Sequence, residues 1–259
     1  MTGIHGRFVW YELVSPDLDR ASAFYADAVG WSATWAPGDG MDYRIFSAGA
    51  DMVAGALALT AEMRDMGVPS CWTGYVGADD VDALAGRVLE AGGGLRVPPT
   101  EIPGIGRFAV VADPQGAVLA LIRWNDPGSP RHAGMGVPGH IGWHELHAAD
   151  GAAAMAWYGH VFGWQEVAAL DMGPAGLYRQ FGTDGGPAVG GMLTKMPGAP
   201  GPCWLYYFGV DDIDAAAARV RAGGGAVVNG PQAVPGGAWI VQAVDPQRAL
   251  FALVGPRRF

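Results

Sequence analysis

Apolar and polar positions follow one order that returns along the chain. Phe8 to Leu13 is strand-like, and Ser15-Pro16 then predicts an N-cap with proline at the first helical position. Apolar residues from Leu18 to Ala28 keep helical spacing until Gly30 ends the run. The pattern therefore predicts a strand followed by an amphipathic helix.

A second strand and helix lie further on. Trp72 to Val76 is strand-like, Asp79 or Asp80 is expected to cap a helix, and Gly92 to Gly94 is expected to end it. Short β segments follow each helix, and the last two of this half meet across Asp113-Pro114-Gln115-Gly116, which suits a type I turn. The predicted unit is βαβββ, present twice in this half of the chain.

The same motifs recur in the second half of the chain. Trp10-x-Glu12-Leu13 returns as Trp143-x-Glu145-Leu146, 133 residues later. Further landmarks repeat in the same order: Phe24-Tyr25 as Trp157-Tyr158, Gly30-Trp31 as Gly163-Trp164, and Asp113-Pro114-Gln115 as Asp245-Pro246-Gln247. Repetition of this kind indicates a duplicated domain, so a site proposed in one half must be checked in the other.

An α+β chain of four tandem βαβββ modules is the prediction that follows. We expect a first domain at residues 1–124, a Gly- and Pro-rich linker at 125–138, and a second domain at 139–259. Each domain is expected to hold two of the modules.

Composition narrows the classes of function. The chain has 259 residues, half of them apolar, which suffices for two cores. A net charge of −9 argues against nucleic acid and anionic membranes as partners, because a phosphate-binding face needs clustered Lys and Arg. Neither a signal peptide nor a membrane span is expected, which leaves the cytoplasm as the predicted location. Cys71 and Cys203 are expected to be small core residues rather than a disulfide.

This order of motifs resembles the vicinal oxygen chelate superfamily, which includes glyoxalase I, extradiol dioxygenases and bleomycin-resistance proteins. The resemblance rests on the stretch from Phe24 to Trp31 after an acidic turn, on the hairpin from Asp113 to Gly116, and on their recurrence. It is strongest to two-domain glyoxalase-like proteins of the mycobacterial secreted-antigen type. It implies two glyoxalase-fold domains in which cupped mixed sheets are built from paired βαβββ modules.

The resemblance also implies where a metal would be held in metal-dependent members. Counting seven residues back from the acidic turn residues Asp17, Asp79, Asp150 and Asp211 gives first-strand positions that are all tryptophan here: Trp10, Trp72, Trp143 and Trp204. The closing-strand positions are Ala120 and Ala252. An indole N–H only donates and alanine offers no lone pair, so no metal ligands and no cofactor are predicted, although a divalent metal elsewhere stays open.

Alternation along a strand predicts what lines each cup instead. Residues two apart share a face. The expected ligand-binding side chains of the first cup are therefore Trp10, Glu12 and Trp72, and those of the second are Trp143, Glu145, His147, Trp204 and Tyr206. Aromatic walls with one carboxylate suit a planar, apolar or cationic small molecule. Core packing of the tryptophans is the alternative.

The roles of the carboxylates stay open at this point. Arg44 or Arg179 could pair with Glu12 or Glu145 in a structural contact, because a buried carboxylate needs a partner. In an enzyme, Glu145 and His147 are the candidate catalytic residues, helped by the Tyr206 hydroxyl. His144 is expected to face away from both.

Three functions follow from these patterns. The first is a metal-free protein that binds a small aromatic or apolar molecule, as a monomer or a homodimer. The second is a glyoxalase- or lyase-type, or hydroxylase- or dioxygenase-type, enzyme that uses Glu145 and His147 or an unrecognised metal site. The third is a non-catalytic scaffold whose cups are filled by their own side chains.

Overall fold

The computed structural model describes residues 3–36, 42–126, 135–199 and 201–258. The elements of the first half are β1 (Phe8–Ser15), α1 (Leu18–Val29), β2 (Ser32–Trp35), β3 (Tyr43–Ala48), β4 (Asp51–Ala58), α2 (Ala61–Asp65), β5 (Cys71–Gly77), α3 (Val81–Glu90), β6 (Gly94–Ile102), β7 (Gly106–Ala112) and β8 (Val118–Trp124). Those of the second half are β9 (Ile141–Ala148), α4 (Gly151–Phe162), β10 (Gln165–Asp171), the 3-10 turn η1 (Gly173–Ala175), β11 (Leu177–Gly182), β12 (Ala188–Thr194), β13 (Cys203–Gly209), α5 (Ile213–Ala222), β14 (Ala226–Ala233), β15 (Trp239–Val244) and β16 (Leu250–Gly255).

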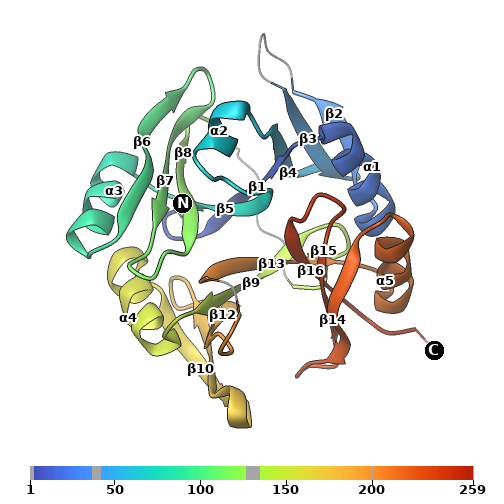
Figure 1. The fold of residues 1–259 in the computed structure, drawn as a ribbon. Coiled ribbons are helices and arrows are strands. Elements are labelled where there is room, and N and C mark those ends of the chain that lie inside the picture. The colour runs from blue at the N-terminus through green and yellow to red at the C-terminus, as the bar shows by residue number, and fades with distance from the viewer. Residues whose placement is uncertain (1–2, 37–41, 127–134, 200, 259) are drawn as a thin grey trace. The chain divides into compact units, whose positions relative to one another are not determined.

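Each half of the sequence forms one mixed sheet of eight strands. The strand orders are β2-β3-β4-β1-β5-β8-β7-β6 and β10-β11-β12-β9-β13-β16-β15-β14, so the second sheet repeats the first strand for strand. The predicted α+β class and the four βαβββ modules are confirmed (Figure 1). The exact domain boundaries stay predictions, and residues 127–134 of the predicted linker lie outside the described residues.

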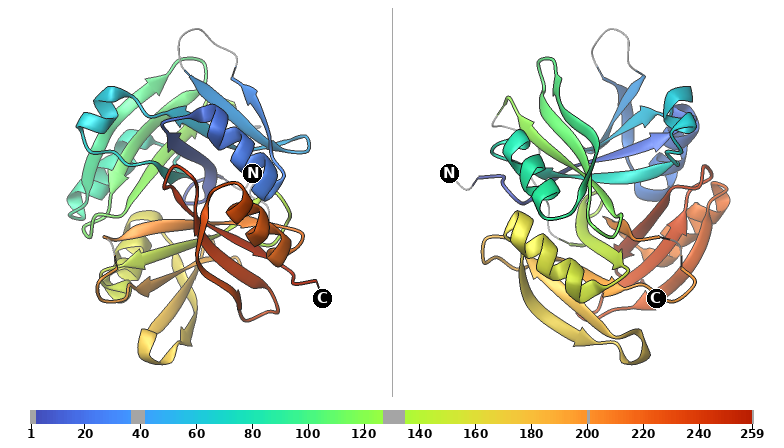
Figure 2. Two further views of the ribbon diagram at one scale, coloured as in Figure 1. Left: turned by 45° about the vertical axis from the view of Figure 1, so that its right-hand side comes forward. Right: turned by 60° about the vertical axis from the view of Figure 1, so that its left-hand side comes forward.

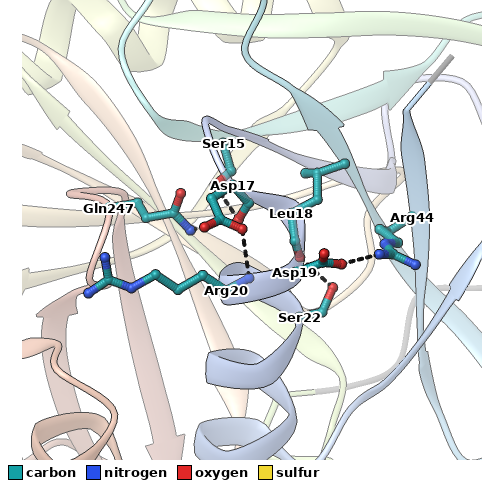
Figure 3. A network of polar contacts seen from close by, with 8 residues as sticks. All are labelled: Ser15, Asp17, Leu18, Asp19, Arg20, Ser22, Arg44 and Gln247. Carbon is teal, nitrogen blue, oxygen red and sulfur yellow. Dashed lines mark hydrogen bonds and ion pairs between the residues drawn. The ribbon is translucent and has the colours of Figure 1, made fainter.

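Helix α1 begins two residues later than the proline pattern predicted. The N-cap is Asp17, whose carboxylate accepts from the backbone N–H of Arg20 at 2.9 Å, and α1 begins at Leu18. A carboxylate cap satisfies an N–H that lacks a partner within the helix. Figure 3 shows this helix start, where the Gln247 side-chain amide also donates to the backbone oxygen of Asp17 at 2.9 Å.

The apolar pattern did not predict the four edge strands of the two sheets: β2, β6, β10 and β14. Strand β6 contains Pro98 and Pro99, and β14 contains Pro231. A proline cannot donate to the ladder and is tolerated at an edge or a bulge. Both strands lie at a sheet edge, and their pairing registers shift at these prolines. An exposed edge strand does not need the alternation of apolar and polar residues on which the prediction relied.

The described chain divides into two compact units that do not follow the halves of the sequence. The described residues of one unit lie within 1–9, 74–131 and 143–205, and those of the other lie within 10–73, 132–142 and 206–259. In the first unit α3 packs against α4, and in the second α1 packs against α5 (Figure 1 and Figure 2). Each unit therefore combines a module from one half with a module from the other.

A buried tyrosine and aspartate join the two modules inside each unit. Tyr25 of α1 donates to Asp245 at 3.1 Å in one unit, and Tyr158 of α4 donates to Asp113 at 3.1 Å in the other. Burial raises the pKa of both aspartates and raises the pKa of Tyr25 well above its usual value, with Asp245 adding to the shift at Tyr25. The repeated Tyr and Asp of the sequence motifs are thus each other's partners.

Among the described residues, no helix is long and apolar enough to cross a membrane.

Candidate functional site

The second half holds a carboxylate on the face of its sheet that is turned away from the helices. Glu145 lies on β9 and is 8% exposed. Its Oε2 accepts from the Tyr178 hydroxyl at 3.0 Å, and the Tyr178 oxygen accepts from Trp143 Nε1 at 2.8 Å. Tyr178 comes from β11 and Trp143 from β9 itself, so two strands build the array. A carboxylate that would be costly to bury alone is thereby paired.

His147 completes this array. It lies two residues beyond Glu145, on the same strand face, and its Nε2 is 2.8 Å from Glu145 Oε1. The His147 side chain is 27% exposed, whereas that of Glu145 is 11% exposed. The carboxylate is therefore held below an imidazole that solvent reaches. The structure brings together Trp143, Glu145 and His147, as the sequence predicted.

A glycine makes room for Tyr178. Gly191 of β12 pairs with Glu145 in the sheet register, and a Cβ at Gly191 would collide with the Tyr178 ring and hydroxyl. Glycine in a strand costs backbone entropy and often marks a close approach. Here the group that approaches Gly191 closely is the Tyr178 ring, whose hydroxyl donates to Glu145.

The first half repeats the same array. Trp10 Nε1 donates to the Tyr43 hydroxyl at 3.1 Å, and Tyr43 is hydrogen-bonded to Glu12. Burial, with Glu12 nearby, raises the pKa of Tyr43 well above its usual value. Gly55 of β4 pairs with Glu12 and leaves space for the Tyr43 ring. The position that corresponds to His147 holds Val14.

The arginines that the sequence offered as partners are engaged elsewhere. Arg44 pairs with Asp19 of α1 (Figure 3), and Arg179 pairs with Glu166 at 2.8 Å. Arg44 and Arg179 directly follow the two tyrosines, and strand alternation turns them to the opposite face. The expectation of an arginine partner is wrong by one residue, and the tyrosines take that role.

Trp72 and Trp204 are not brought to the carboxylates. Trp72 Nε1 donates to Tyr25 of α1 at 2.8 Å, and Trp204 Nε1 donates to Tyr158 of α4 at 3.1 Å. Each ring is 6% exposed and packs on the helix-covered side of its sheet. The prediction that these rings line the cups fails because they point to the other face.

Tyr206 shares the strand face of Trp204. It is fully buried, and its ring centroid is 5.5 Å from that of Tyr11. Burial, followed by the effect of Tyr206, raises the pKa of Tyr11 well above its usual value. His144 faces away from Glu145, as predicted: it is fully buried, stacks on Phe8 and has its Nδ1 at 2.6 Å from the Val189 backbone oxygen.

The strand face of Trp72 and Trp204 is predicted wrongly because the count of seven residues starts from the wrong aspartate of each Asp-Asp pair. The N-caps of α3 and α5 are Asp80 and Asp212, not Asp79 and Asp211. Counting seven residues back from the true caps gives Thr73 and Leu205, one residue past the tryptophans. A shift of one residue turns every side chain to the other face of a strand.

The cysteines lie on the same strand face as Thr73 and Leu205. Burial raises the pKa of Cys71 and of Cys203, and Glu12 and Glu145 respectively raise it further. Both thiols are free and partly buried rather than fully buried core residues. A raised pKa keeps a thiol protonated, which disfavours nucleophilic chemistry.

The residues at the implied metal positions do not fit a metal ion. The only hydrogen-bonding group of Trp10 and of Trp143 is an N–H already donated to tyrosine. Ala120 and Ala252 are fully buried and carry no donor atom. Among the described residues, no group of three or more His, Cys, Asp or Glu side chains is placed to hold a metal.

A repeated tyrosine and a repeated glycine in the sequence could have located the array. Tyr43 and Tyr178 repeat with their own glycines, Gly55 and Gly191, at nearly the same offset. Pairing of a tyrosine with a glycine on an adjacent strand indicates a ring lying flat across the sheet. Only the parallel register of β1 with β4 and of β9 with β12 fixes which carboxylate each ring meets.

Comparison with known proteins places this chain in a family. The model of the family described as Glyoxalase/Bleomycin resistance protein/Dioxygenase superfamily matches residues 7–121 and again 138–253. CFP32 of Mycobacterium tuberculosis, whose name describes it as a presumed glyoxylase, is 32% identical over 252 residues, covering 95% of this chain and 94% of CFP32. The anthracycline biosynthesis protein DnrV of Streptomyces peucetius is 34% identical over 265 residues, covering 96% and 93%.

Solved structures share the fold at lower identity. The Mn(II)-bound glyoxalase of Novosphingobium aromaticivorans aligns with a TM-score of 0.65 and 21% identity, over 97% of this chain and 82% of that chain. The 2,2',3-trihydroxybiphenyl 1,2-dioxygenase of Sphingomonas wittichii aligns with a TM-score of 0.66 and 13% identity, over 96% and 89%. At these identities the likeness shows a common fold.

Proposed function

Because the chain belongs to the glyoxalase/bleomycin resistance protein/dioxygenase superfamily, we propose that it binds a small aromatic or apolar organic molecule without a metal ion. The observation that carries the proposal is the Trp-Tyr-Glu array, which occupies the helix-free sheet face in both halves in place of metal ligands. Indole and phenol rings offer apolar area for stacking, and a fixed carboxylate orients a polar group.

The name of one relative supports an aromatic ligand. DnrV is named for anthracycline biosynthesis, and anthracyclines are polycyclic aromatic molecules. Trp143 and Tyr178 are partly exposed, so part of each ring remains open to a stacking partner. The protein is expected to be a cytoplasmic monomer or homodimer whose partner is a small molecule rather than nucleic acid or a membrane.

Tryptophan fluorescence titrated with a panel of aromatic compounds tests the proposal. Saturable quenching is expected for at least one compound, and it should weaken in Trp143→Phe or in Trp10→Phe according to which half binds. Quenching that never saturates for any compound would contradict binding and favour a scaffold with self-filled cups. Elemental mass spectrometry on the same preparation, before and after incubation with Zn²⁺, Ni²⁺, Fe²⁺ and Mn²⁺, tests the metal-free part. Stoichiometric retained metal would contradict that part.

A second function is favoured by the 2.8 Å contact between His147 and Glu145. A carboxylate that orients an imidazole is a general-base arrangement, so a lyase- or oxidoreductase-type enzyme of this superfamily is the alternative. Glu145→Ala and His147→Ala should then each abolish turnover of a substrate found by screening. Turnover that survives both changes would remove these residues from catalysis.

A further inference from the structure

His147 distinguishes the two halves chemically. In the neutral imidazole one ring nitrogen carries a hydrogen and the other has a lone pair. A carboxylate only accepts, so the 2.8 Å contact with Glu145 Oε1 requires the hydrogen on Nε2. The lone pair therefore lies on Nδ1. Nδ1 makes no hydrogen bond with any of the residues that the structure describes.

Two neighbouring side chains, Trp143 and Tyr178, also use their hydrogens within the array. Trp143 donates its N–H to Tyr178, and Tyr178 donates its O–H to Glu145 Oε2. Glu145 thus receives one hydrogen from Tyr178 and one from His147 on its two oxygens. The hydrogens of Tyr178 and His147 are directed toward Glu145, that of Trp143 is directed toward Tyr178, and the partly exposed His147 side chain offers an acceptor.

We propose that the second-half site selects hydroxyl-bearing aromatic molecules, whose O–H donates to His147 Nδ1 while the ring stacks on the aromatic side chains beside it. In this role Glu145 is a positioning residue that fixes the His147 tautomer and orientation. The first half has Val14 at the matching position, and a valine side chain has no acceptor. The inference rests on the proposed function and assigns it a ligand class and one hydroxyl-selective site per chain.

A matched pair of probes tests the hydroxyl. The full-length protein is titrated at neutral pH with 2-naphthol and with 2-methoxynaphthalene, which differ only in whether the oxygen carries a hydrogen or a methyl group. A neutral hydrogen bond changes affinity by about threefold to tenfold, so 2-naphthol should bind more tightly by that factor and with one selective site. His147→Val should remove the preference while changing affinity for the methyl ether less than about twofold.

Val14→Ala is the control, because it alters the equivalent first-half position and should keep the preference. Nitrogen NMR of histidine-labelled wild-type protein gives a second readout that needs no variant to fold. The His147 Nδ1 resonance should be that of an unprotonated nitrogen and should shift with 2-naphthol, but less with its methyl ether.

The outcomes distinguish a failure of the His147 role from a failure of small-molecule binding. Equal binding of the probes to the wild type, or a preference that survives in His147→Val, overturns the role of His147 and leaves small-molecule binding standing. A wild-type spectrum with the hydrogen on Nδ1 also overturns it. Saturable binding of other aromatic compounds without binding of either probe overturns the hydroxyl-aromatic class alone, whereas binding of no compound overturns the proposed function as well.

Discussion

Glu12 and Glu145 occupy equivalent positions in two copies of one repeat, but only Glu145 has a histidine on the same strand face. Both carboxylates are held by a tyrosine that also accepts from a tryptophan. The tryptophan and tyrosine that both halves share thus support a partly buried carboxylate. Burying that carboxylate without a hydrogen-bond partner would cost several kcal/mol. His147 exceeds that structural requirement, so the two halves differ chemically at this one position of the shared array.

The largest effect is expected from closing the space behind each tyrosine. Gly191→Ala places a methyl group against Tyr178, and Gly55→Ala places one against Tyr43. Overpacking of this kind costs about 1–3 kcal/mol, and each change should also push its tyrosine off the carboxylate. Urea unfolding should show similar losses in both variants, whereas only Gly191→Ala should weaken binding of 2-naphthol. Unchanged stability in either would contradict the close approach.

Removing the tyrosine hydroxyls should cost somewhat less. Tyr178→Phe leaves Trp143 Nε1 without its acceptor and removes a donor to Glu145. Loss of a buried partner costs about 1–2 kcal/mol, so thermal or urea unfolding should detect it. Tyr43→Phe in the first half is the matched control and should give the same loss. A clearly smaller loss in Tyr43→Phe would show that the two arrays are not energetically equivalent.

Transplanting the histidine should make the halves alike. Val14→His places an imidazole two residues from Glu12, on the same strand face. The change in stability should remain within about 1.5 kcal/mol in either direction, since a hydrogen bond to the carboxylate offsets the lost valine packing. A second hydroxyl-selective site should appear in calorimetric titration with 2-naphthol. One site per chain, despite an intact fold, would show that the first half lacks more than the histidine.

The smallest expected effect is the pH dependence of stability from Asp113 and Asp245, which should be the same in the two halves. Burial raises the pKa of Asp113 and Asp245 above the usual 3.8, so the folded protein holds these protons more tightly than the unfolded chain. Their contribution to stability is therefore complete below pH 3.8 and is lost as the pH rises through the folded pKa. Relative to Asp113→Asn or Asp245→Asn, the wild type should gain stability on acidification from pH 7 toward that value. Pulse proteolysis across this range should give parallel curves for the two variants.

Most of the fold could be predicted from the repeat and the apolar pattern. The strands that carry the repeated Trp-x-Glu-Leu motif, such as β9, and the helices closed by glycine were expected within a residue or two. The edge strands β6 and β14 were missed, because their prolines are tolerated at bulges that no local pattern indicates.

The site was predicted only in part, for a physical reason. Trp143, Glu145 and His147 share one strand, so alternation alone places them together. Trp204 comes from another strand, where the phase depends on which of two adjacent aspartates caps the next helix. Tyr178 contacts Glu145 through the register of β9, β12 and β11, which only the folded sheet defines.

The Tyr25–Asp245 and Tyr158–Asp113 hydrogen bonds each tie one copy of the duplication to the other. Deleting either copy would strand a tyrosine and an aspartate in the half that remains. Each copy therefore depends on the other to pair its buried tyrosine and aspartate. The copies differ at positions such as Val14 and His147, whereas the residues that join them are the same in both.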